Sequence, residues 1–225
     1  AYDLGLKVFD LALDLPTGDI TVEPALDERG AAATMAFGME AIAGGTDLLC
    51  LGDFGIGNST VAAAVCAALF GGRGADWVGD EPGADNSMTG RKAGMVDAAL
   101  AVHGGHLSDP LEVLRRLGGR EMAAIAGAIV AARSEHIPVL LDGYAAVAAA
   151  AVLKATNPDA IGHCLLAGLS GDLGHAKAAS RLGLGPLLDL GIGESGVAAT
   201  LAVGLLKAAV TCHSAVAVAG ARPPI

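Results

Sequence analysis

Short apolar runs alternate with longer segments of helical periodicity along this chain. The apolar runs are "DLLCLG" (47–52), "IPVLLDG" (137–143), "AIGHCLLAGLS" (160–170) and "PLLDLG" (186–191). Short runs of this kind are typical of strands, and an uninterrupted apolar run indicates a strand that is buried on both faces. Strands that alternate with helices in this way predict βαβ units around a parallel sheet.

The predicted helices carry their own boundary signals. Asp27 is the expected N-cap of a helix that ends at Gly44-Gly45, and Asp109 followed by Pro110 begins another helix that ends before Gly118. Ser59 or Thr60 is the expected N-cap of the helix after the first strand. Further helices are expected over 91–103, 120–133, 144–155, 175–183 and 195–213. No internal repeat or interior linker is visible, so residues 1–225 are predicted to form a single α/β domain.

The turns that follow the strands carry the candidate chemistry, because ligands of parallel α/β sheets bind beyond the carboxyl ends of the strands. An acid at such a turn often serves only as a helix cap. The glycines around Asp53 and Glu194 favour a ligand site, since they let a ligand approach the backbone closely. The turns are "GDFGIGNST" (52–60), "DGY" (142–144), "GLSGDLGH" (168–175) and "GIGESG" (191–196), and their acids are Asp53, Asp142, Asp172 and Glu194.

The first of these turns is not a Walker A loop, because it lacks the GK[ST] ending, and it is not a clean GxGxxG motif. Its glycines can present several N–H groups to an anion at a helix N-terminus. Asp53 would repel a phosphate, so we expect it to face a sugar hydroxyl or a developing cation. An anion beside a sugar indicates a nucleotide-like ligand. Glu194 is either a charge at a helix N-terminus or a general base whose pKa partial burial would raise.

Composition and charge narrow the class of protein further. The chain is 53% hydrophobic with a mean hydropathy of +0.55, but its longest uncharged apolar stretches reach only about half of the roughly 20 residues that span a bilayer. The net charge of −10 argues against nucleic acid or an anionic membrane as a partner. The four cysteines and six histidines show no metal-binding spacing, so free thiols and no metal are expected. Without a leader-peptide pattern, we expect a cytoplasmic protein.

At the level of motifs the chain resembles a known family. "GDFGIGNST" is similar to the GEMGIGNTT signature of the nicotinate-nucleotide–dimethylbenzimidazole phosphoribosyltransferase family. The resemblance continues through "DPLEVLRRLGGREMAAIAGAIVAAR", "IPVLLDGYAAVAAAAVL", "PLLDLGIGESG" and "AAVTCHS", in the expected order, over roughly residues 15 to 215. It implies a Rossmann-like parallel sheet with flanking helices. It also implies a homodimer and a reduced small helical portion, to which residues 1–45 and 196–225 would contribute.

The resemblance implies a reaction without a cofactor. The phosphoribosyl group of nicotinate mononucleotide would pass to 5,6-dimethylbenzimidazole or a related base, giving α-ribazole 5′-phosphate and nicotinate for cobalamin biosynthesis. Glu194 would be the general base, Asp53 would lie beside the ribose and the incipient cation, and Lys92 would serve the phosphate or the leaving group. The other substrate contacts that it implies are Gly55, Gly57, Asn58, Ser59, Gly83, Ser170, His175 and Gly193, with Ser170 and His175 on the phosphate side.

Several ligand loops depart from the family pattern. Asp53 stands where the family has Glu, and Asp80-Glu81-Pro82 replaces a Gly-Thr stretch, which adds negative charge near a bound phosphate. Other departures are Phe54 for Met, Ser59 for Thr, Gly168 for His and the loss of an Arg before Glu194, and the family's N-terminal part is longer. Two alternatives therefore stay open: a module that binds a nucleotide or aromatic base without transfer, and a scaffold that only dimerises.

Overall fold

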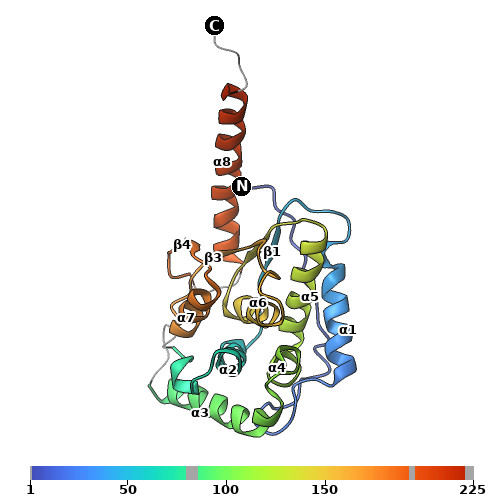
Figure 1. The fold of residues 1–225 in the computed structure, drawn as a ribbon, viewed down its shortest axis with the longest axis vertical. Coiled ribbons are helices and arrows are strands. Elements are labelled where there is room, and N and C mark those ends of the chain that lie inside the picture. The colour runs from blue at the N-terminus through green and yellow to red at the C-terminus, as the bar shows by residue number, and fades with distance from the viewer. Residues whose placement is uncertain (1, 80–85, 193–195, 221–225) are drawn as a thin grey trace.

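The computed structural model describes residues 2–79, 86–192 and 196–220, and its centre is a parallel sheet of four strands (Figure 1). The order of the strands in the sheet is the same as their order in the chain, with Leu49 paired to Val139 and Leu141 paired to Leu166. The predicted α/β class is confirmed. The strands are β1 (Leu49–Leu51), β2 (Val139–Leu141), β3 (Cys164–Gly168) and β4 (Pro186–Leu188).

Each predicted helix is present, and two of the predicted N-caps are confirmed. Asp27 accepts a hydrogen bond from the Gly30 N–H (2.6 Å), and Asp109 accepts one from the Leu111 N–H (2.9 Å). The helices are α1 (Glu28–Met39), α2 (Asn58–Phe70), α3 (Asn86–His103), α4 (Pro110–Leu117), α5 (Arg120–Ser134), α6 (Tyr144–Thr156), α7 (Leu173–Leu182) and α8 (Val197–Gly220). In the described part of the chain, three short 3-10 turns lie between them, η1 (Glu40–Ile42), η2 (Gly74–Asp76) and η3 (Gly104–His106).

The predicted start of α2 is wrong. Its N-cap is Gly57 rather than Ser59 or Thr60, and the helix begins at Asn58. Gly57 has a φ of 84°, a left-handed conformation that favours glycine, and this turn directs the chain into the helix earlier than the hydroxyl residues indicated.

The two faces of the sheet are covered differently. Because strands follow one another in sequence order, right-handed crossovers place the connecting helices on one face. Val139 and Leu141 belong to the main core on that face, whereas Leu140 packs with Ala167 on the opposite face. The beginning of α8 covers the opposite face with Ala198, Ala199, Ala202 and Val203.

Beyond this contact, α8 extends away from the body of the molecule (Figure 1). By length and composition alone, its segment Val197–Val216 could cross a membrane, and 22% of the segment is buried inside the structure. Lys207 interrupts its apolar sequence, and its first turns pack on the sheet. The core helix of a globular protein packs in the same way and can be equally long and apolar. The length and apolarity of α8 are therefore weak evidence that it spans a membrane.

Small residues allow the helices of the main core to approach closely. Ten consecutive residues of α6, Tyr144–Leu153, are buried. A Cβ atom on Gly38 of α1 would lie 1.9 Å from the Ala124 carbonyl oxygen of α5, and one on Gly127 of α5 would lie 2.0 Å from the Met35 carbonyl oxygen. Helix α1 is therefore held against α5 by direct backbone contact, which no larger side chain would allow.

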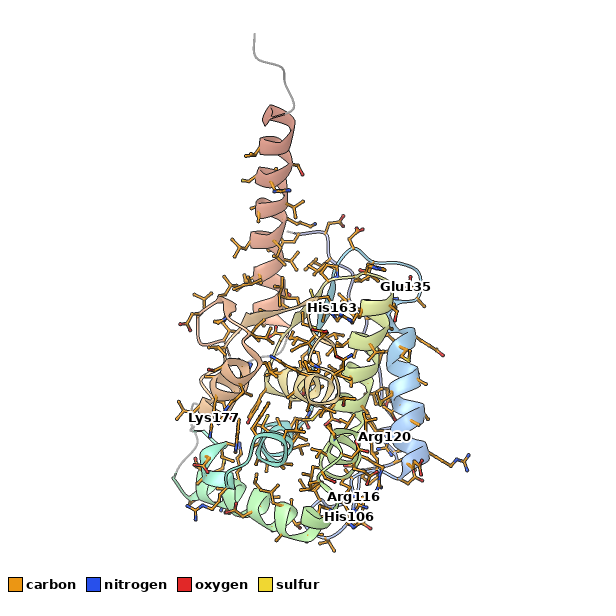
Figure 2. All side chains as sticks on the ribbon, viewed as in Figure 1. His106, Arg116, Arg120, Glu135, His163 and Lys177 are labelled. Atoms are coloured by element: carbon orange, nitrogen blue, oxygen red, sulfur yellow. The ribbon has the colours of Figure 1, made fainter. Side chains whose placement is uncertain are left out.

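A surface cation ties α7 to the 3-10 turn before α3. Lys177 lies on α7 near η2 (Figure 2). Its Nζ lies 4.2 Å from the centroid of the Trp77 ring and donates a hydrogen bond to the Asp76 carbonyl oxygen (2.9 Å). The Trp77 side chain is fully buried and stacks on Phe70 of α2. This contact holds α7 against residues 76 and 77.

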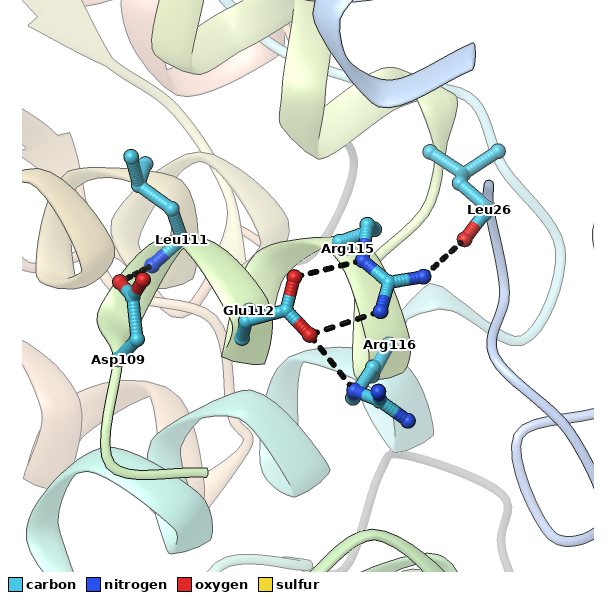
Figure 3. Close-up of polar contacts among 6 residues, drawn as sticks. All are labelled: Leu26, Asp109, Leu111, Glu112, Arg115 and Arg116. Carbon is cyan, nitrogen blue, oxygen red and sulfur yellow. Dashed lines mark hydrogen bonds and ion pairs between the residues drawn. The ribbon is translucent and has the colours of Figure 1, made fainter. Parts of the chain in front are cut away.

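A charged cluster on α4 anchors the segment that enters α1 (Figure 3). The Glu112 carboxylate accepts hydrogen bonds from Nε (2.7 Å) and Nη2 (2.7 Å) of Arg115 and from Nε of Arg116 (2.8 Å). Arg115 also donates through Nη1 to the Leu26 carbonyl oxygen (3.1 Å). The Ala25 and Leu26 N–H groups donate to the carbonyl oxygens of Arg116 and Arg115.

This cluster predicts a pH-dependent contribution to stability. Hydrogen bonds from Arg115 and Arg116 lower the pKa of Glu112 from 4.5 to about 2. A depressed carboxyl pKa stabilises the folded state above the unfolded pKa, and the contribution is lost as the pH falls toward the folded pKa. We expect Glu112→Gln to lower the free energy of unfolding at pH 7 by at most about 1 kcal/mol, because the cluster is partly exposed. The difference from the unsubstituted protein should shrink between pH 5 and pH 2.

Urea unfolding at several pH values measures this difference. Glu40→Gln, in the exposed 3-10 turn after α1, is the matched control and should show no such trend. A Glu112→Gln effect that stays constant down to pH 2 would contradict the prediction.

Candidate active site

The loops that follow the strands meet at one edge of the sheet because all four strands are parallel. This edge carries the loop after β1 with Asp53, the loop after β2 with Asp142 and the loop after β3 with Ser170. The predicted site residues Gly83, Gly193 and Glu194 lie outside the described residues. The described flanks of the last two are β4 and the start of α8.

Asp53 is fixed by its own loop. Its Oδ2 accepts hydrogen bonds from the Asn58 side-chain amide (2.6 Å) and from the Gly55 N–H (3.3 Å). A Cβ atom on Gly55 would lie 1.8 Å from Asn58 Nδ2, so a larger residue here would displace the amide that holds Asp53. The next side chains, Phe54 and Ile56, are 80% and 103% exposed. A fixed carboxylate thus lies beside an exposed apolar turn.

Lys92 brings a positive charge from α3 to the same place. Its Nζ donates a hydrogen bond to Ser59 Oγ (3.2 Å) in the first turn of α2. The N-terminus of α2 adds its own partial positive charge. Ser59 and Lys92 were predicted as substrate contacts, and the structure brings these two side chains together in an arrangement suited to an anion.

Asp142 is a buried helix cap. Its Oδ2 accepts hydrogen bonds from the N–H groups of Gly196 and Ala199, both at 2.8 Å, at the start of α8. Burial raises the pKa of Asp142, the two hydrogen bonds lower it and the charge of Asp53 raises it further. These contacts support an ordering role, in which Asp142 links the end of β2 to the end of the loop that contains Glu194.

Glu121, in the first turn of α5, was missed by the sequence analysis. Burial raises the pKa of its carboxyl group, and the charge of Asp53 raises it further. Its side chain folds over Gly119, where a Cβ atom would lie 2.4 Å from Oε1. The carboxylates of Glu121 and Asp142 thus both interact with that of Asp53. The sequence analysis looked for acids in the turns that follow strands. Glu121 lies just after the junction of two helices, α4 and α5, and so was not among the candidates.

The loop after β3 is closed by a buried histidine. Asp172 caps α7 by accepting a hydrogen bond from the Gly174 N–H (2.7 Å). His175 is 1% exposed and stacks on the Tyr144 ring, with the ring centroids 5.8 Å apart. Burial lowers the pKa of His175 to about 4, so the ring is neutral near pH 7. Ser170 lies half-buried above it, and the burial of the ring is at odds with a direct phosphate contact by His175.

Within the described part of the chain, no group of three or more His, Cys, Asp or Glu side chains is arranged to hold a metal ion. Cys50, Cys66, Cys164 and Cys212 are free thiols. The described site therefore consists of carboxylates, one lysine, hydroxyl groups and backbone N–H groups.

Together, the parallel sheet, the glycine turn with Asp53 and the Ser59–Lys92 pair define an α/β protein whose sheet edge suits a phosphorylated sugar ligand. The Phosphoribosyltransferase family model matches residues 1–221, and the chain belongs to this family. The family resemblance found in the sequence is thereby confirmed.

Two relatives that are named for their reaction are similar to this chain in sequence. The chain is 64% identical to the nicotinate-nucleotide–dimethylbenzimidazole phosphoribosyltransferases of Rhizobium johnstonii and Rhizobium rhizogenes. The alignments cover 96% of this chain and 64% of each relative, so the chain spans less than two thirds of the length of these relatives.

Solved structures agree with the fold. A crystal structure of CobT from Thermus thermophilus superposes with a TM-score of 0.79 at 38% identity, covering 86% of this chain and 59% of that one. A structure of the nicotinate-nucleotide–dimethylbenzimidazole phosphoribosyltransferase of the same organism gives a TM-score of 0.78 at 37% identity, covering 86% and 58% of the two chains.

Proposed function

We propose that the protein transfers the phosphoribosyl group of nicotinate mononucleotide to 5,6-dimethylbenzimidazole or a related base. The products are α-ribazole 5′-phosphate and nicotinate, within cobalamin biosynthesis. The observation that carries the proposal is the 64% identity, over 96% of the chain, to relatives that bear this name. The Asp53 turn and the Ser59–Lys92 pair support it, because an acid and a cation at this edge of the sheet have the chemistry that a sugar phosphate needs.

The reaction breaks one bond at the anomeric carbon of the ribose and forms another. One ring nitrogen of the benzimidazole attacks this carbon while the bond to the nicotinate nitrogen breaks, and its electron pair leaves with nicotinate. The proton on the other ring nitrogen passes to the Glu194 carboxylate, which acts as general base. Positive charge that develops on the ribose is stabilised by the Asp53 carboxylate, with Glu121 adding negative charge nearby.

The remaining polar groups serve the nucleotide. Lys92 and Ser59 bind the phosphate or the leaving group, and the N–H groups of the turn at Gly55, Gly57 and Asn58 line the nucleotide. Ser170 belongs to the phosphate side. Gly83 and Gly193 are proposed as backbone contacts from the family motif alone.

We further propose that the protein acts in the cytoplasm as a homodimer, without a nucleic acid or membrane partner. Residues 1–45 and 196–225 would contribute to a small helical portion beside the α/β body. One face of α8 supports a helical partner, since Leu201, Leu205 and Val216 are exposed along it. Single apolar side chains on a surface are ordinary, but a row of them along one helix is typical of an interface.

Ligand-induced stabilisation tests the proposed function. Nicotinate mononucleotide at about 100 times its Kd should stabilise the protein by about 2.7 kcal/mol, which corresponds to an increase in Tm of about 5–10 °C for a chain of this size. Lys92→Ala should reduce this shift, whereas Arg181→Ala, an exposed cation at the far end of α7, should leave it unchanged. Incubation with both substrates should release α-ribazole 5′-phosphate. A shift without product would favour the binding module, and the absence of both would refute the proposal.

A further inference from the structure

Two hydrogen bonds from Ser170 converge on one nitrogen of His175. The Ser170 N–H donates to His175 Nδ1 (3.2 Å), and the Ser170 hydroxyl lies 2.9 Å from the same atom. A neutral imidazole nitrogen that accepts a hydrogen bond has a single lone pair for this purpose. The N–H donor therefore identifies Nδ1 as the acceptor and places the ring proton on Nε2.

The other ring nitrogen of His175, Nε2, carries the proton but does not use it in a hydrogen bond within the described structure. Nε2 is buried and has no hydrogen-bond partner among the described residues. The ring is almost fully buried and stacks on Tyr144 at an interplanar angle of 16°. A buried N–H without a partner is costly and calls for an explanation. The acceptor at Nδ1 supplies one, because only this tautomer leaves a lone pair facing Ser170.

The single lone pair of His175 Nδ1 needs only one of the two Ser170 donors. The backbone N–H of Ser170 can satisfy the Nδ1 lone pair alone, so the hydroxyl group can rotate to another acceptor without leaving the histidine unpaired. Ser170 is half-buried at the carboxyl edge of the sheet, in the loop that leads into α7. The Asp172 N–H lies 3.4 Å from Ser170 Oγ and helps to hold the oxygen in place.

We propose that His175 is a positioning residue that fixes Ser170, so that the Ser170 hydroxyl turns from Nδ1 to a phosphate oxygen of the bound nucleotide. This inference rests on the proposed function, which supplies the phosphate. A released hydroxyl donates its hydrogen, and a phosphate oxygen is a strong acceptor for it.

The affinity for nicotinate mononucleotide divided by the affinity for nicotinate riboside, called the affinity ratio below, measures the phosphate contact directly. Calorimetry gives the Kd of nicotinate mononucleotide and of nicotinate riboside, which lacks the phosphate. Ser170→Ala should weaken binding of the mononucleotide about tenfold and leave the riboside unchanged, because one charge-assisted hydrogen bond is lost. An equal loss for both ligands would show that the hydroxyl serves the ribose or the ring, and would overturn the proposal.

Two substitutions at His175 separate positioning from packing. His175→Phe keeps an aromatic ring against Tyr144 but removes the acceptor, and should lower the affinity ratio as Ser170→Ala does. His175→Asn loses the ring but offers an amide oxygen near the position of Nδ1, and should retain the ratio. The double variant Ser170→Ala/His175→Phe should lose no more than either single variant.

The opposite order, in which His175→Phe keeps the ratio and His175→Asn loses it, would mean that the ring acts only by packing. Circular dichroism and Tm establish that each variant is folded before its affinities are compared. If the unsubstituted protein binds neither ligand, the proposed function itself fails. If it binds both and every variant keeps the ratio, the inference about Ser170 and His175 fails while the proposed function stands. If only Ser170→Ala lowers the ratio, the role of His175 alone fails.

Discussion

Replacing Glu194 by Gln is expected to lower the turnover number about 10²–10⁴-fold, the range that a positioned general base contributes. The amide cannot take the proton from the benzimidazole nitrogen during attack. It nearly preserves the size of the side chain, so the Kd for nicotinate mononucleotide should change by no more than about twofold.

The measurement is the rate of α-ribazole 5′-phosphate formation together with the affinity for the nucleotide. Glu135→Gln is a matched control, because Glu135 is exposed at the end of α5 opposite to Arg120 (Figure 2). A Glu194→Gln variant that keeps its turnover within a few-fold would remove this residue from the mechanism and leave Asp53 or Glu121 as the base to examine.

Replacing Asp142 by Ala is expected to lower the free energy of unfolding by about 3 kcal/mol, because two N–H groups at the start of α8, one part-buried and one buried, lose a charged acceptor. For a chain of this length the corresponding fall in Tm is about 6–12 °C. Both N–H groups donate to the same carboxylate oxygen, Oδ2. Asp142→Asn can place its single carbonyl oxygen there and should therefore be clearly milder.

Thermal unfolding followed by circular dichroism compares the two variants. The affinity for nicotinate mononucleotide should also fall in Asp142→Ala, since the cap fixes Gly196 at the end of the loop that carries Glu194. If Asp142→Ala is as stable as the unsubstituted protein, the hydrogen bonds to α8 contribute nothing. If both variants lose stability equally, the charge rather than the oxygen position matters.

Local signals account for what the sequence predicted well. The four strands are short apolar runs, and Asp27 and Asp109 are caps that act within a few residues of their own position. Caps of this kind can be predicted from the sequence, because the residues that form their hydrogen bonds are only two or three positions apart. The start of α2 was predicted wrongly. It depends on the left-handed conformation of Gly57, whereas the prediction followed the hydroxyl groups of the residues after it.

Contacts between distant segments could not be predicted. Asp142 meets α8, Glu121 interacts with Asp53 and His175 stacks on Tyr144 only after the helices have packed. A linear pattern gives the residue types but neither the burial nor the partner, and these decide whether an acid caps a helix or serves a ligand. The roles of Glu194, Gly193 and Gly83 stay predictions from the family motif.

The link between Asp142 and α8 has a consequence for the order in which the chain is made. β2 and Asp142 leave the ribosome well before residues 196–199, which supply the partners of the carboxylate. Until those residues emerge, the apolar face with Leu140 and Ala167 has no cover from α8, and Asp142 keeps a shell of water. The nascent chain therefore passes through a stage with an open apolar sheet face, the kind of surface that chaperones protect. That stage ends when the last helix docks, and the same event completes the ligand edge.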